Sequence, residues 1–378
     1  MIFDLFAVAA PGLSAIAAEE IQKLQIPGAE KARTEAGGVT LRTDLGGLYR
    51  ANLNLRTATR VLARLGHFHA ANFPELRRKA GRLSWGLYLA PGQPVALRVT
   101  CHKSRLYHSD AVAERVLAAI GDSLGQAPPT GDFDEERQGQ PQLVIVRFYR
   151  DQCTISLDSS GEALHRRGYR LASAKAPLRE TLAAGMLLAA GWDGKRPLLD
   201  PFCGSGTIPI EAGLLSAGLA PGRARRFAFM DWPNFLEKVW EQALEAAQPP
   251  ERGAAPFILG SDRDAGAVTM ASENAQRAGV GAQTAFIHQA VSAVEAPPGP
   301  SGLILTNPPY GIRVSSGHDL RNLYAQFGSV LRAKFPGWQV GVLCNDDRLL
   351  SHTGLNFDRG LSLNNGGTPV KLALGRID

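Results

Sequence analysis

The stretch LLDPFCGSGT, residues 198–207, decides the fold that the sequence predicts. Two leucines lead into an acid, and a turn with two glycines then opens a helix predicted over 207–217. Gly204 and Gly206 let the backbone turn sharply and approach a ligand closely. The free N–H groups at the start of the helix favour an anionic group such as a carboxylate, whereas Asp200 is suited to an ammonium group. No Lys of a phosphate loop follows, and the full spacing of a dinucleotide-binding motif is absent.

Apolar runs and helical patterns alternate around this stretch, from residue 176 to residue 378. Strands separated by helices are typical of an α/β fold with a parallel sheet covered by helices on both faces. After the strand that ends at Asp200, further strands are predicted at 257–262, 285–288, 303–306 and 339–344, with two more at 361–363 and 370–374. The predicted helices cover 177–190, 207–217, 265–278 and 320–335. An insert between Ala217 and Pro256 is predicted to form a helix and a cap near the sheet edge.

The first part of the chain mixes shorter strands and helices. Residues 1–60 read as a small α+β unit of ferredoxin-like type, with strands at 3–8 and 37–42 and helices at 14–24 and 44–53. The next hundred residues repeat this texture, with strands at 61–68, 94–101, 143–150 and 153–158, a basic helix at 73–84 and another helix at 110–124. A tight turn is predicted between the last two strands, at residues 150–152.

Positive charge is concentrated in the first half of the chain. Residues 1–180 contain 24 lysines and arginines against 18 acids, whereas residues 181–378 contain 17 of each. The excess is either a solvated basic surface or an electrostatic footprint for nucleic acid. Two polar stretches, 102–109 and 164–170, combine cations with a tyrosine that could stack on a base. The candidate RNA-binding residues are Lys103, Arg105, His108, Arg166, Arg167 and Arg170.

Cysteine usage and hydropathy indicate a cytoplasmic protein. The four cysteines form no CxxC pair and have no histidine spacing suited to zinc, so we expect reduced thiols and no metal. Residues 1–20 briefly resemble a signal peptide, but a basic start is missing and Asp4 interrupts the apolar run. A strand over 2–9 and a helix from Ser14 are predicted there instead. No window is apolar enough for a membrane span, so no membrane partner is expected.

A second motif, GSDRD at 260–264, follows the second strand of the predicted sheet. An acid at that position can bond both hydroxyls of a ribose, and this is the function we assign to Asp262. Asp264 is better explained as the N-cap of the next helix.

The third motif, TNPPYG at 306–311, follows the apolar run Leu303–Leu305. Its two prolines remove backbone donors, which leaves their carbonyls and the amide oxygen of Asn307 as acceptors. Such acceptors can hold an –NH₂ group, and Tyr310 can stack on a flat molecule. A nucleobase with an exocyclic amine meets both conditions. The three motifs are expected to converge on one crevice at the carboxyl edge of the sheet.

With these motifs, residues 195–375 resemble a class I S-adenosylmethionine-dependent methyltransferase that modifies amino groups. The whole chain is similar to the bacterial guanine-N2 RNA methyltransferases of 23S rRNA and to their tRNA-modifying relatives. The stretches LNLRTATRVL (53–62), LDSSGEALHRRGYR (157–170) and APLRE (176–180) carry that similarity. It implies a Rossmann-like methyltransferase domain preceded by a ferredoxin-like and THUMP RNA-binding region. The implied boundaries are 1–60 for the ferredoxin-like part, 61–160 for THUMP, 161–180 for a linker and 181–378 for the methyltransferase.

The resemblance also implies roles for single residues. Asn307 and the Pro308 carbonyl would accept hydrogen bonds from the target amine, beside Pro309, while Tyr310 stacks on the base. Cys203 would be a small packed residue in the cofactor loop rather than a catalytic thiol. The residues expected to line S-adenosylmethionine are Pro177, Asp200, Phe202, Cys203, Gly204, Ser205, Gly206, Thr207, Asp262, Arg263, Gln289 and Asn307.

One departure and two alternatives accompany this interpretation. Many relatives place an acid after the third strand, where this chain reads IHQAV at 287–291, so Gln289 or backbone atoms would recognise the adenine. The first alternative is an adenine-N6 methyltransferase of DNA or RNA, because the NPPY motif serves that chemistry too. The second is a non-catalytic RNA-binding protein with a methyltransferase fold. A monomer acting on structured rRNA or tRNA remains the leading expectation.

Overall fold

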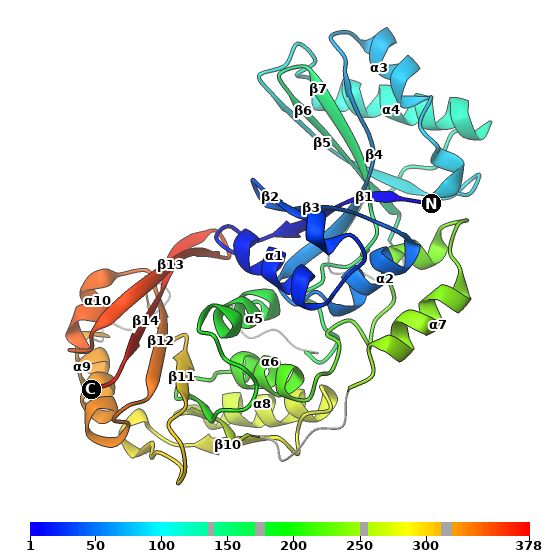
Figure 1. The fold of residues 1–378 in the computed structure, drawn as a ribbon. Coiled ribbons are helices and arrows are strands. Elements are labelled where there is room, and N and C mark those ends of the chain that lie inside the picture. Colours follow the sequence, from blue (N-terminus) through cyan, green and yellow to red (C-terminus); the bar gives the residue numbers. More distant parts are fainter. Residues whose placement is uncertain (135–139, 171–177, 250–255, 311–319) are drawn as a thin grey trace. The chain divides into compact units, whose positions relative to one another are not determined.

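The chain forms two compact units, and neither is continuous in sequence (Figure 1). The computed structural model describes residues 1–134, 140–170, 178–249, 256–310 and 320–378. The first unit comprises Met1–Ala9, Ala17–Leu164 and Ala224–Ala246. The second comprises Ala10–Ile16, His165–Arg223 and Ala247–Asp378. The linker predicted at 161–180 therefore contains the point at which the chain leaves the first unit.

The first unit is built on one sheet in the order β2-β3-β1-β4-β7-β6-β5. Its neighbouring strands are antiparallel except for the parallel pair β5 and β6. The long strand β4 pairs with β1 near its start and with β7 further along, so it joins the two halves of the sheet. The strands are β1 (Phe3–Ala9), β2 (Arg33–Glu35), β3 (Gly38–Thr43), β4 (Ala58–His69), β5 (Val95–His102), β6 (Gln142–Tyr149) and β7 (Gln152–Asp158).

Local sequence signals account for the helices and the hairpin of this unit. Asp44 caps α2 by accepting a hydrogen bond from the Gly47 N–H group at 2.8 Å, and Asn72 caps α3 in the same way. Arg150 and Asp151 both have positive φ, which matches the strand twist of a two-residue hairpin and confirms the predicted turn. The helices are α1 (Ser14–Lys23), α2 (Leu45–Asn54), α3 (Phe73–Ala80), α4 (Ser109–Leu124) and α7 (Glu237–Ala246), with short 3-10 turns at Ala29–Lys31, Trp85–Leu87 and Ala228–Asp231.

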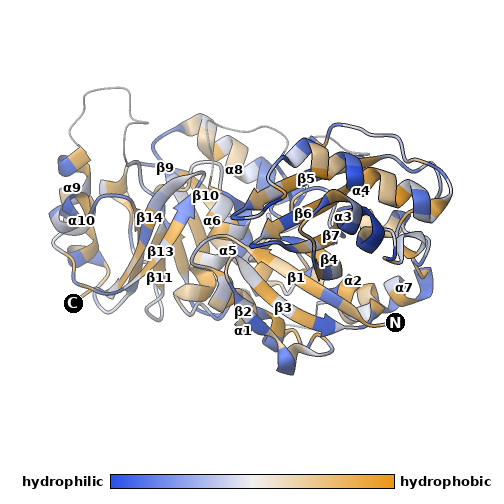
Figure 2. Cartoon of the chain, turned by 90° about the horizontal axis from the view of Figure 1, so that it is seen from above, coloured by the Kyte–Doolittle hydropathy of each residue, from blue (hydrophilic) through white to orange (hydrophobic). Residues whose placement is uncertain are grey.

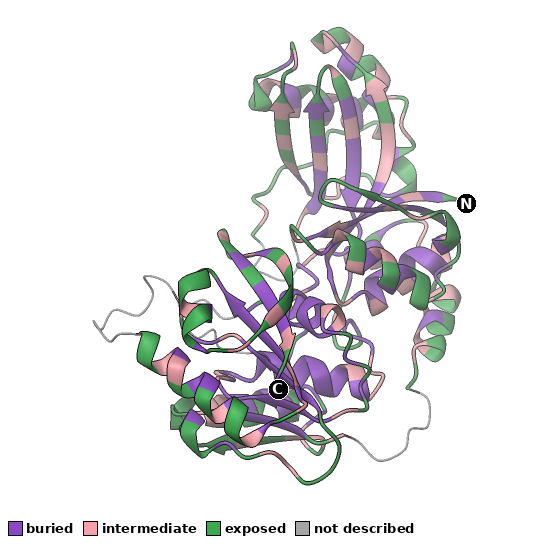
Figure 3. Cartoon of the chain, turned by 60° about the vertical axis from the view of Figure 1, so that its left-hand side comes forward, coloured by how far each residue is buried: buried purple, intermediate pink, exposed green. Residues whose placement is uncertain are grey.

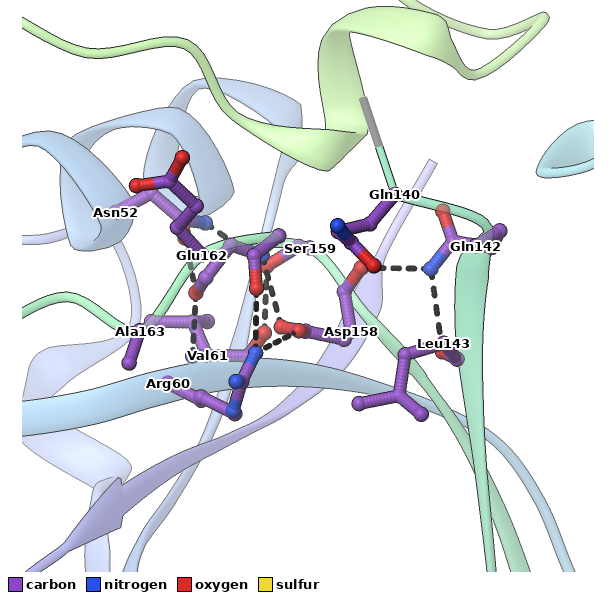
Figure 4. A network of polar contacts seen from close by, with 12 residues as sticks. Asn52, Arg60, Val61, Gln140, Gln142, Leu143, Asp158, Ser159, Glu162 and Ala163 are labelled. Carbon is purple, nitrogen blue, oxygen red and sulfur yellow. Dashed lines mark hydrogen bonds and ion pairs between the residues drawn. The ribbon is translucent and has the colours of Figure 1, made fainter. Parts of the chain in front are cut away.

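A buried polar network ties α2 to β4, β6 and β7 at the junction of the two sheet halves (Figure 4). Arg60 forms an ion pair with Asp158, both buried. The Asn52 side chain donates to the Ser159 hydroxyl at 2.9 Å, and that hydroxyl donates to the Val61 carbonyl at 2.7 Å. Buried polar groups are tolerated when they are hydrogen-bonded to one another, and the network thereby fixes how the strands meet.

The insert predicted to cap the second sheet belongs to the first unit instead. Its helix α7 is present, but Ala224–Ala246 packs with the N-terminal elements, so the predicted location was wrong. Tyr49 on α2 stacks on Phe229 with ring centroids 4.5 Å apart. Trp232 meets Tyr88 edge to face, and its indole N–H donates to a glutamine of β6 at 2.7 Å. Aromatic residues in an insert predict burial, but they do not say against which core.

The second unit is built on a sheet in the order β10-β9-β8-β11-β12-β14-β13. The first five strands are parallel, and β14 is antiparallel to both of its neighbours. All the predicted strands are present, and the antiparallel direction of β14 is the addition. The strands are β8 (Leu198–Asp200), β9 (Ile258–Asp262), β10 (Thr284–His288), β11 (Leu303–Thr306), β12 (Gln339–Cys344), β13 (Phe357–Asn365) and β14 (Thr368–Arg376).

Helices cover both faces of this sheet, as predicted. Residues of α9 and α10 share one core with β8, β11 and β12, whereas α6 and α8 share a second core around Ile210 and Leu214. Figure 1 shows α5, α6 and α8 on one side of the strands and α9 and α10 on the other. The helices are α5 (Glu180–Ala189), α6 (Thr207–Ser216), α8 (Ala265–Arg277), α9 (Leu320–Lys334) and α10 (Asp347–His352), with a 3-10 turn at Val291–Ala293.

Apolar side chains follow the strands of both sheets. Figure 2 shows the strands largely in the hydrophobic colours, and Figure 3 shows the central strands mostly buried. Within the described ranges, no helix combines the length and the apolar character that a membrane crossing requires.

Candidate active site

The second sheet has a topological switch point between β8 and β11. Chain order runs outward from β8 through β9 to β10 on one side, and from β11 to β12 on the other. Ligands of open α/β sheets bind in the crevice outside the carboxyl ends of the strands at such a point. The glycine-rich turn follows β8 directly, and the NPPY turn follows β11 directly. Two of the three predicted motifs therefore flank the same crevice.

A hydrogen bond joins the two strand ends at the switch point. The Thr306 hydroxyl donates to Asp200 Oδ1 at 2.6 Å, and both residues are buried. The Phe202 N–H group donates to the same oxygen at 3.2 Å. Thr306 is the last residue of β11, so its side chain fixes the Asp200 carboxylate relative to the residue that follows, Asn307.

The Asp200 carboxyl has a strongly shifted pKa. Burial raises its pKa from 3.8 to about 7, although the bonds from Thr306 and Phe202 oppose the shift, and the nearby charge of Asp262 raises it further. A buried carboxyl with such a pKa gains from a neighbouring cation, which stabilises the ionised form. An ammonium group of a ligand could provide that charge.

The glycines of the turn satisfy different requirements. Gly206 has φ +85°, and an added Cβ would lie 2.9 Å from Ala271 and 3.0 Å from the Phe286 ring. Gly204 has φ +50°, and an added Cβ would meet no described atom within 4 Å. Gly206 is therefore needed for conformation and for close packing of α6 against α8 and β10, whereas Gly204 is needed for conformation alone.

Asp262 ends β9 beside the glycine-rich turn. Its Oδ2 accepts from the Gly204 N–H group and its Oδ1 from the Asp264 N–H group, each at 3.0 Å. The Gln289 N–H group bonds to the Asp262 carbonyl at 3.0 Å, which places Gln289 at the end of the next strand. The predicted N-cap is confirmed, since Asp264 accepts from two N–H groups at the start of α8. Arg263 is exposed, and its carbonyl lies 3.0 Å from His288 Nε2.

Two other members of the predicted cofactor loop are held by neighbouring helices. The Ser205 carbonyl accepts from the Asn274 side chain on α8 at 3.0 Å. Cys203 is buried, and burial together with the charges of Asp200 and Asp262 raises the pKa of its thiol well above the usual value. A thiol in that setting stays protonated, which fits the packing role predicted for it.

Asn307 presents a buried acceptor at the switch point. Its Oδ1 atom is buried, and within the described ranges it has no hydrogen-bond partner. Leaving a carbonyl oxygen unsatisfied in this way costs about 1–3 kcal/mol, and a ligand with an N–H donor could satisfy it. Predicted neighbours after Tyr310, from Gly311 onward, and the predicted cofactor residue Pro177 lie outside the described residues.

Two residues far from the motif position the rest of the turn. The Tyr324 hydroxyl on α9 donates to the Pro309 carbonyl at 3.3 Å. The Asn365 side chain on β13 donates to the Tyr310 hydroxyl at 2.9 Å. Tyr310 also packs on the core shared by α9 and the sheet. These contacts fix the orientation of the ring that was predicted to stack on a base.

Part of the polar stretch 164–170 is buried against α6, where its side chains form ion pairs and hydrogen bonds within the protein. Arg167 pairs with Glu211, with 2% and 0% of their side chains exposed. Tyr169 is buried and donates to the same carboxylate at 3.3 Å. Arg170 pairs with Glu180 at 3.2 Å and donates to the Thr207 hydroxyl at 2.7 Å. Burial of Arg167 and Tyr169 argues against the phosphate contact and the base stacking predicted for them. Arg170 is partly exposed, and its phosphate contact stays a prediction.

The remaining predicted RNA contacts occupy different surroundings. Lys103, Arg105 and His108 are exposed in the loop between β5 and α4. Tyr107 is also exposed, and its ring lies 4.0 Å from that of His108. Arg166 is partly exposed in the second unit. Arg105 forms an ion pair with Asp151 at 3.8 Å but remains largely exposed. The loop keeps the properties of an RNA-contacting surface, namely exposed cations and an aromatic ring.

Sequence reasoning did not assign a role to the residues that hold the motifs in place. Thr306 belongs to the quoted motif, and its role could have been found, because it ends the strand next to the one that carries Asp200. Tyr324 and Asn365 could not have been found from spacing, since they meet the turn only through the packing of α9 and β13. The site combines a buried carboxyl with a raised pKa, a second carboxyl at the end of the neighbouring strand and an unsatisfied amide acceptor.

Comparison with protein families divides the chain into three matches. Residues 4–62 match the RlmL ferredoxin-like domain, residues 70–158 match the THUMP domain, and residues 167–372 match the RMKL-like methyltransferase domain. The last match covers more than half of the chain. It contains every residue described above at the switch point.

Curated relatives match along almost the whole chain. A relative from Synechocystis sp., whose name proposes an RNA methyltransferase, is 38% identical, covering 97% of this chain and 95% of its own length. The ribosomal RNA large subunit methyltransferase K/L of Syntrophotalea carbinolica is 37% identical, over 97% of this chain and 52% of its own. The chain thus spans about half the length of the K/L relatives.

Solved structures share the fold of both units. SMU.472, described as a proposed methyltransferase complexed with SAH, is 27% identical with a TM-score of 0.88, covering 100% of this chain and 98% of its own. A protein from Listeria monocytogenes, described as a predicted N6-adenine-specific DNA methylase, is 32% identical with a TM-score of 0.87, over 100% and 97%.

Proposed function

The chain belongs to the RMKL-like methyltransferase family, and from that premise we propose that it methylates the exocyclic N2 amine of a guanosine in rRNA or tRNA. The methyl donor would be S-adenosylmethionine. The observation that carries the proposal is the buried, unsatisfied Oδ1 atom of Asn307 at the switch point. An acceptor without a donor is what a site needs if an –NH₂ group is to arrive there.

The residues at the switch point fit the proposed cofactor. The ionisable Asp200 suits the ammonium group of its methionine end, and the positive-φ turn at Gly204 and Gly206 lets the chain approach it closely. Asp262 ends the neighbouring strand, where a ribose would be held. When bound, S-adenosylmethionine supplies an electrophilic methyl group. Gln289 is the side chain we assign to the adenine, since it follows the third strand.

The chemistry required of the protein is positioning. Asn307 Oδ1 and the Pro308 carbonyl would accept the two hydrogens of the amine, which orients the nitrogen lone pair toward the incoming carbon. Tyr324 already engages the Pro309 carbonyl, so Pro308 is the proline assigned to the amine. Tyr310, held by Asn365, would stack on a base that is flipped out or unpaired.

Methylation of RNA from cells that lack the gene tests the proposal directly. We expect labelled methyl groups to appear in RNA as N2-methylguanosine when total RNA is incubated with the protein and digested to nucleosides. The matched control is the same RNA from cells that retain the gene, which should accept little label because its sites are already modified.

Other outcomes of that assay discriminate the alternatives. Label in N6-methyladenosine, or in duplex DNA, would favour the adenine reading suggested by the name of the Listeria structure. An absence of label together with no heat stabilisation by S-adenosylhomocysteine would favour a non-catalytic RNA-binding protein.

Cofactor affinity is expected to fall below neutral pH. Because the pKa of Asp200 is raised to about 7, the free protein holds this proton below that pH and must release it to meet an ammonium group. The affinity for S-adenosylhomocysteine should be about tenfold higher at pH 8 than at pH 6, measured by calorimetry. In Asp200→Asn the affinity should be weaker and this difference should disappear. An equal pH dependence in both proteins would contradict the assignment.

Several further assignments are part of the proposal. We infer a ferredoxin-like part over 1–60, a THUMP part over 61–160, a linker over 161–180 and a methyltransferase domain over 181–378. The three family matches fall in similar places and support these boundaries. The insert that packs in the first unit is an exception to the simple division. We also infer that the protein acts as a cytoplasmic monomer, which sedimentation and cell fractionation would test.

A further inference from the structure

A cavity of about 760 Å³ lies between α3 and α4 of the first unit, outside every site described above. The two helices pack against each other, and Figure 1 shows them together beside the strands β4 to β7. Figure 2 shows α3 as strongly hydrophilic. The lining residues that matter are four arginines, one acid and one aromatic ring: Arg77, Arg78, Arg82, Arg115, Asp122 and Phe73.

Two of the arginines are fixed in place by contacts between the helices. Arg77 makes a bidentate pair with Asp122 through its Nε at 2.8 Å and its Nη2 at 2.9 Å. The guanidinium of Arg115 lies over the Phe73 ring, 5.7 Å from the centroid. These contacts connect α3 to α4, and both arginines line the cavity.

The other two arginines supply uncompensated charge. Arg78 and Arg82 are exposed, and neither forms an ion pair with another residue of the described ranges. Cations in the last turn of a helix stabilise it, which accounts for Arg77 and Arg78. That effect does not account for Arg82, which lies beyond the last residue of α3, or for Arg115, which comes from α4. Four guanidinium groups therefore border one cavity with a single carboxylate.

We propose that this cavity is a phosphate-binding subsite that grips the backbone of the RNA substrate. Guanidinium groups bind phosphate oxygens in a bidentate manner, and the volume lies within the ~300–1,000 Å³ of small-ligand pockets. Arg115 and Phe73 also line the cavity, and guanidinium and aromatic groups are both groups on which an unpaired base can stack. The inference rests on the proposed function only in that RNA is the substrate.

The cavity would extend the contact surface predicted in the loop before α4. His108 precedes α4 and Arg115 lies seven residues later on the same helix, about 10 Å along its axis. One helix thus presents the exposed loop at its start and the arginine cavity further along. An RNA strand following α4 could meet both.

Charge reversal of the two unpaired arginines tests the subsite. We expect Arg78→Glu/Arg82→Glu to weaken binding of a fluorescein-labelled oligouridylate at least about tenfold more than a matched control does. The slope of log K against the logarithm of the salt concentration should become shallower by about 1.4, the change expected for two lost phosphate contacts on a single strand. Binding is measured by fluorescence anisotropy on the full chain without cofactor.

The control is Arg33→Glu/Arg42→Glu, which makes the same charge change at exposed positions of β2 and β3. Equal losses in the two double variants would overturn the subsite, because only the general field of the unit would then matter. The neutral variant Arg78→Ala/Arg82→Ala provides the same comparison if charge reversal disturbs folding, as judged by thermal melting.

Two further readouts separate this inference from neighbouring ones. In one contrary result, GTP or pyrophosphate binds the unaltered protein but not Arg78→Glu/Arg82→Glu, while oligouridylate binds both equally. That result would mean that the cavity takes a small polyphosphate ligand, and it would overturn RNA binding there. Failure to find N2-methylguanosine would overturn the proposed function, but the binding experiment contains no methyl transfer and would be unaffected.

Discussion

Asn307→Ala is expected to lower the rate of methyl transfer by at least about 10²–10³-fold while changing S-adenosylhomocysteine affinity little. The reason is that its Oδ1 atom is a buried acceptor at the end of β11, with no partner in the described part of the chain. Removing one preorganised group that stabilises a transition state typically costs that much in kcat. The measurement is single-turnover methyl transfer together with calorimetric titration of the cofactor product.

A matched control is Asn322→Ala, which removes the same side chain from an exposed position on α9. Its rate should stay close to that of the unaltered protein, because alanine is favourable in a helix. If Asn307→Ala loses cofactor affinity and its transfer rate falls only by the same factor, Asn307 binds the cofactor and not the amine.

Much of this site could be predicted because its motifs are local. Asp200, Asp262 and Asn307 each follow an apolar run, and parallel strands bring their carboxyl ends to the same edge of a sheet. The order of the strands then decides which ends are neighbours. The sequence predicted convergence on one crevice, and the hydrogen bond between Thr306 and Asp200 confirms how close two of the strand ends are.

What could not be predicted depends on packing between distant segments. Tyr324 and Asn365 reach the NPPY turn from α9 and β13, and no local pattern marks either residue as part of the site. The insert carrying Trp232 was assigned to the wrong core, since an aromatic side chain indicates burial but not its partner. The amphipathic pattern of α3 predicted a basic helix, but only its packing on α4 forms a cavity.

The stretch 164–170 shows that a row of cations in a sequence does not distinguish an RNA-binding surface from buried ion pairs. Arg167 and an exposed arginine such as Arg78 have the same sequence signal, namely a cation among polar neighbours. The difference lies in Glu211, which sits on α6 and is fully buried. An acid within an apolar helix is itself a signal, because a buried carboxylate requires a partner. Arg167 is a nearby cation, so the acid at Glu211 already indicates that this arginine belongs to the interior and not to an RNA-binding surface.

The buried pair also gives the largest expected effect on stability. Arg167→Met should destabilise the second unit by about 3–5 kcal/mol, because it leaves the Glu211 carboxylate buried without its cation. The double variant Arg167→Met/Glu211→Leu should recover most of this loss, since replacing both partners by apolar groups is often neutral or stabilising. Hydrogen exchange of α6 peptides, measured by mass spectrometry, reports the change within the unit itself.

Arg348→Met is the matched control, at an exposed position where we expect a change within about 0.5 kcal/mol. Similar exchange in Arg167→Met and in this control would show that the pair contributes little to stability. The double variant also tests the role of the arginine, because it removes the cation without leaving a charge unpaired. If Arg167 braces α6 and does not touch RNA, the folded double variant should bind oligouridylate as tightly as the unaltered protein. A loss of RNA affinity in the folded double variant would mean that Arg167 contributes to RNA binding.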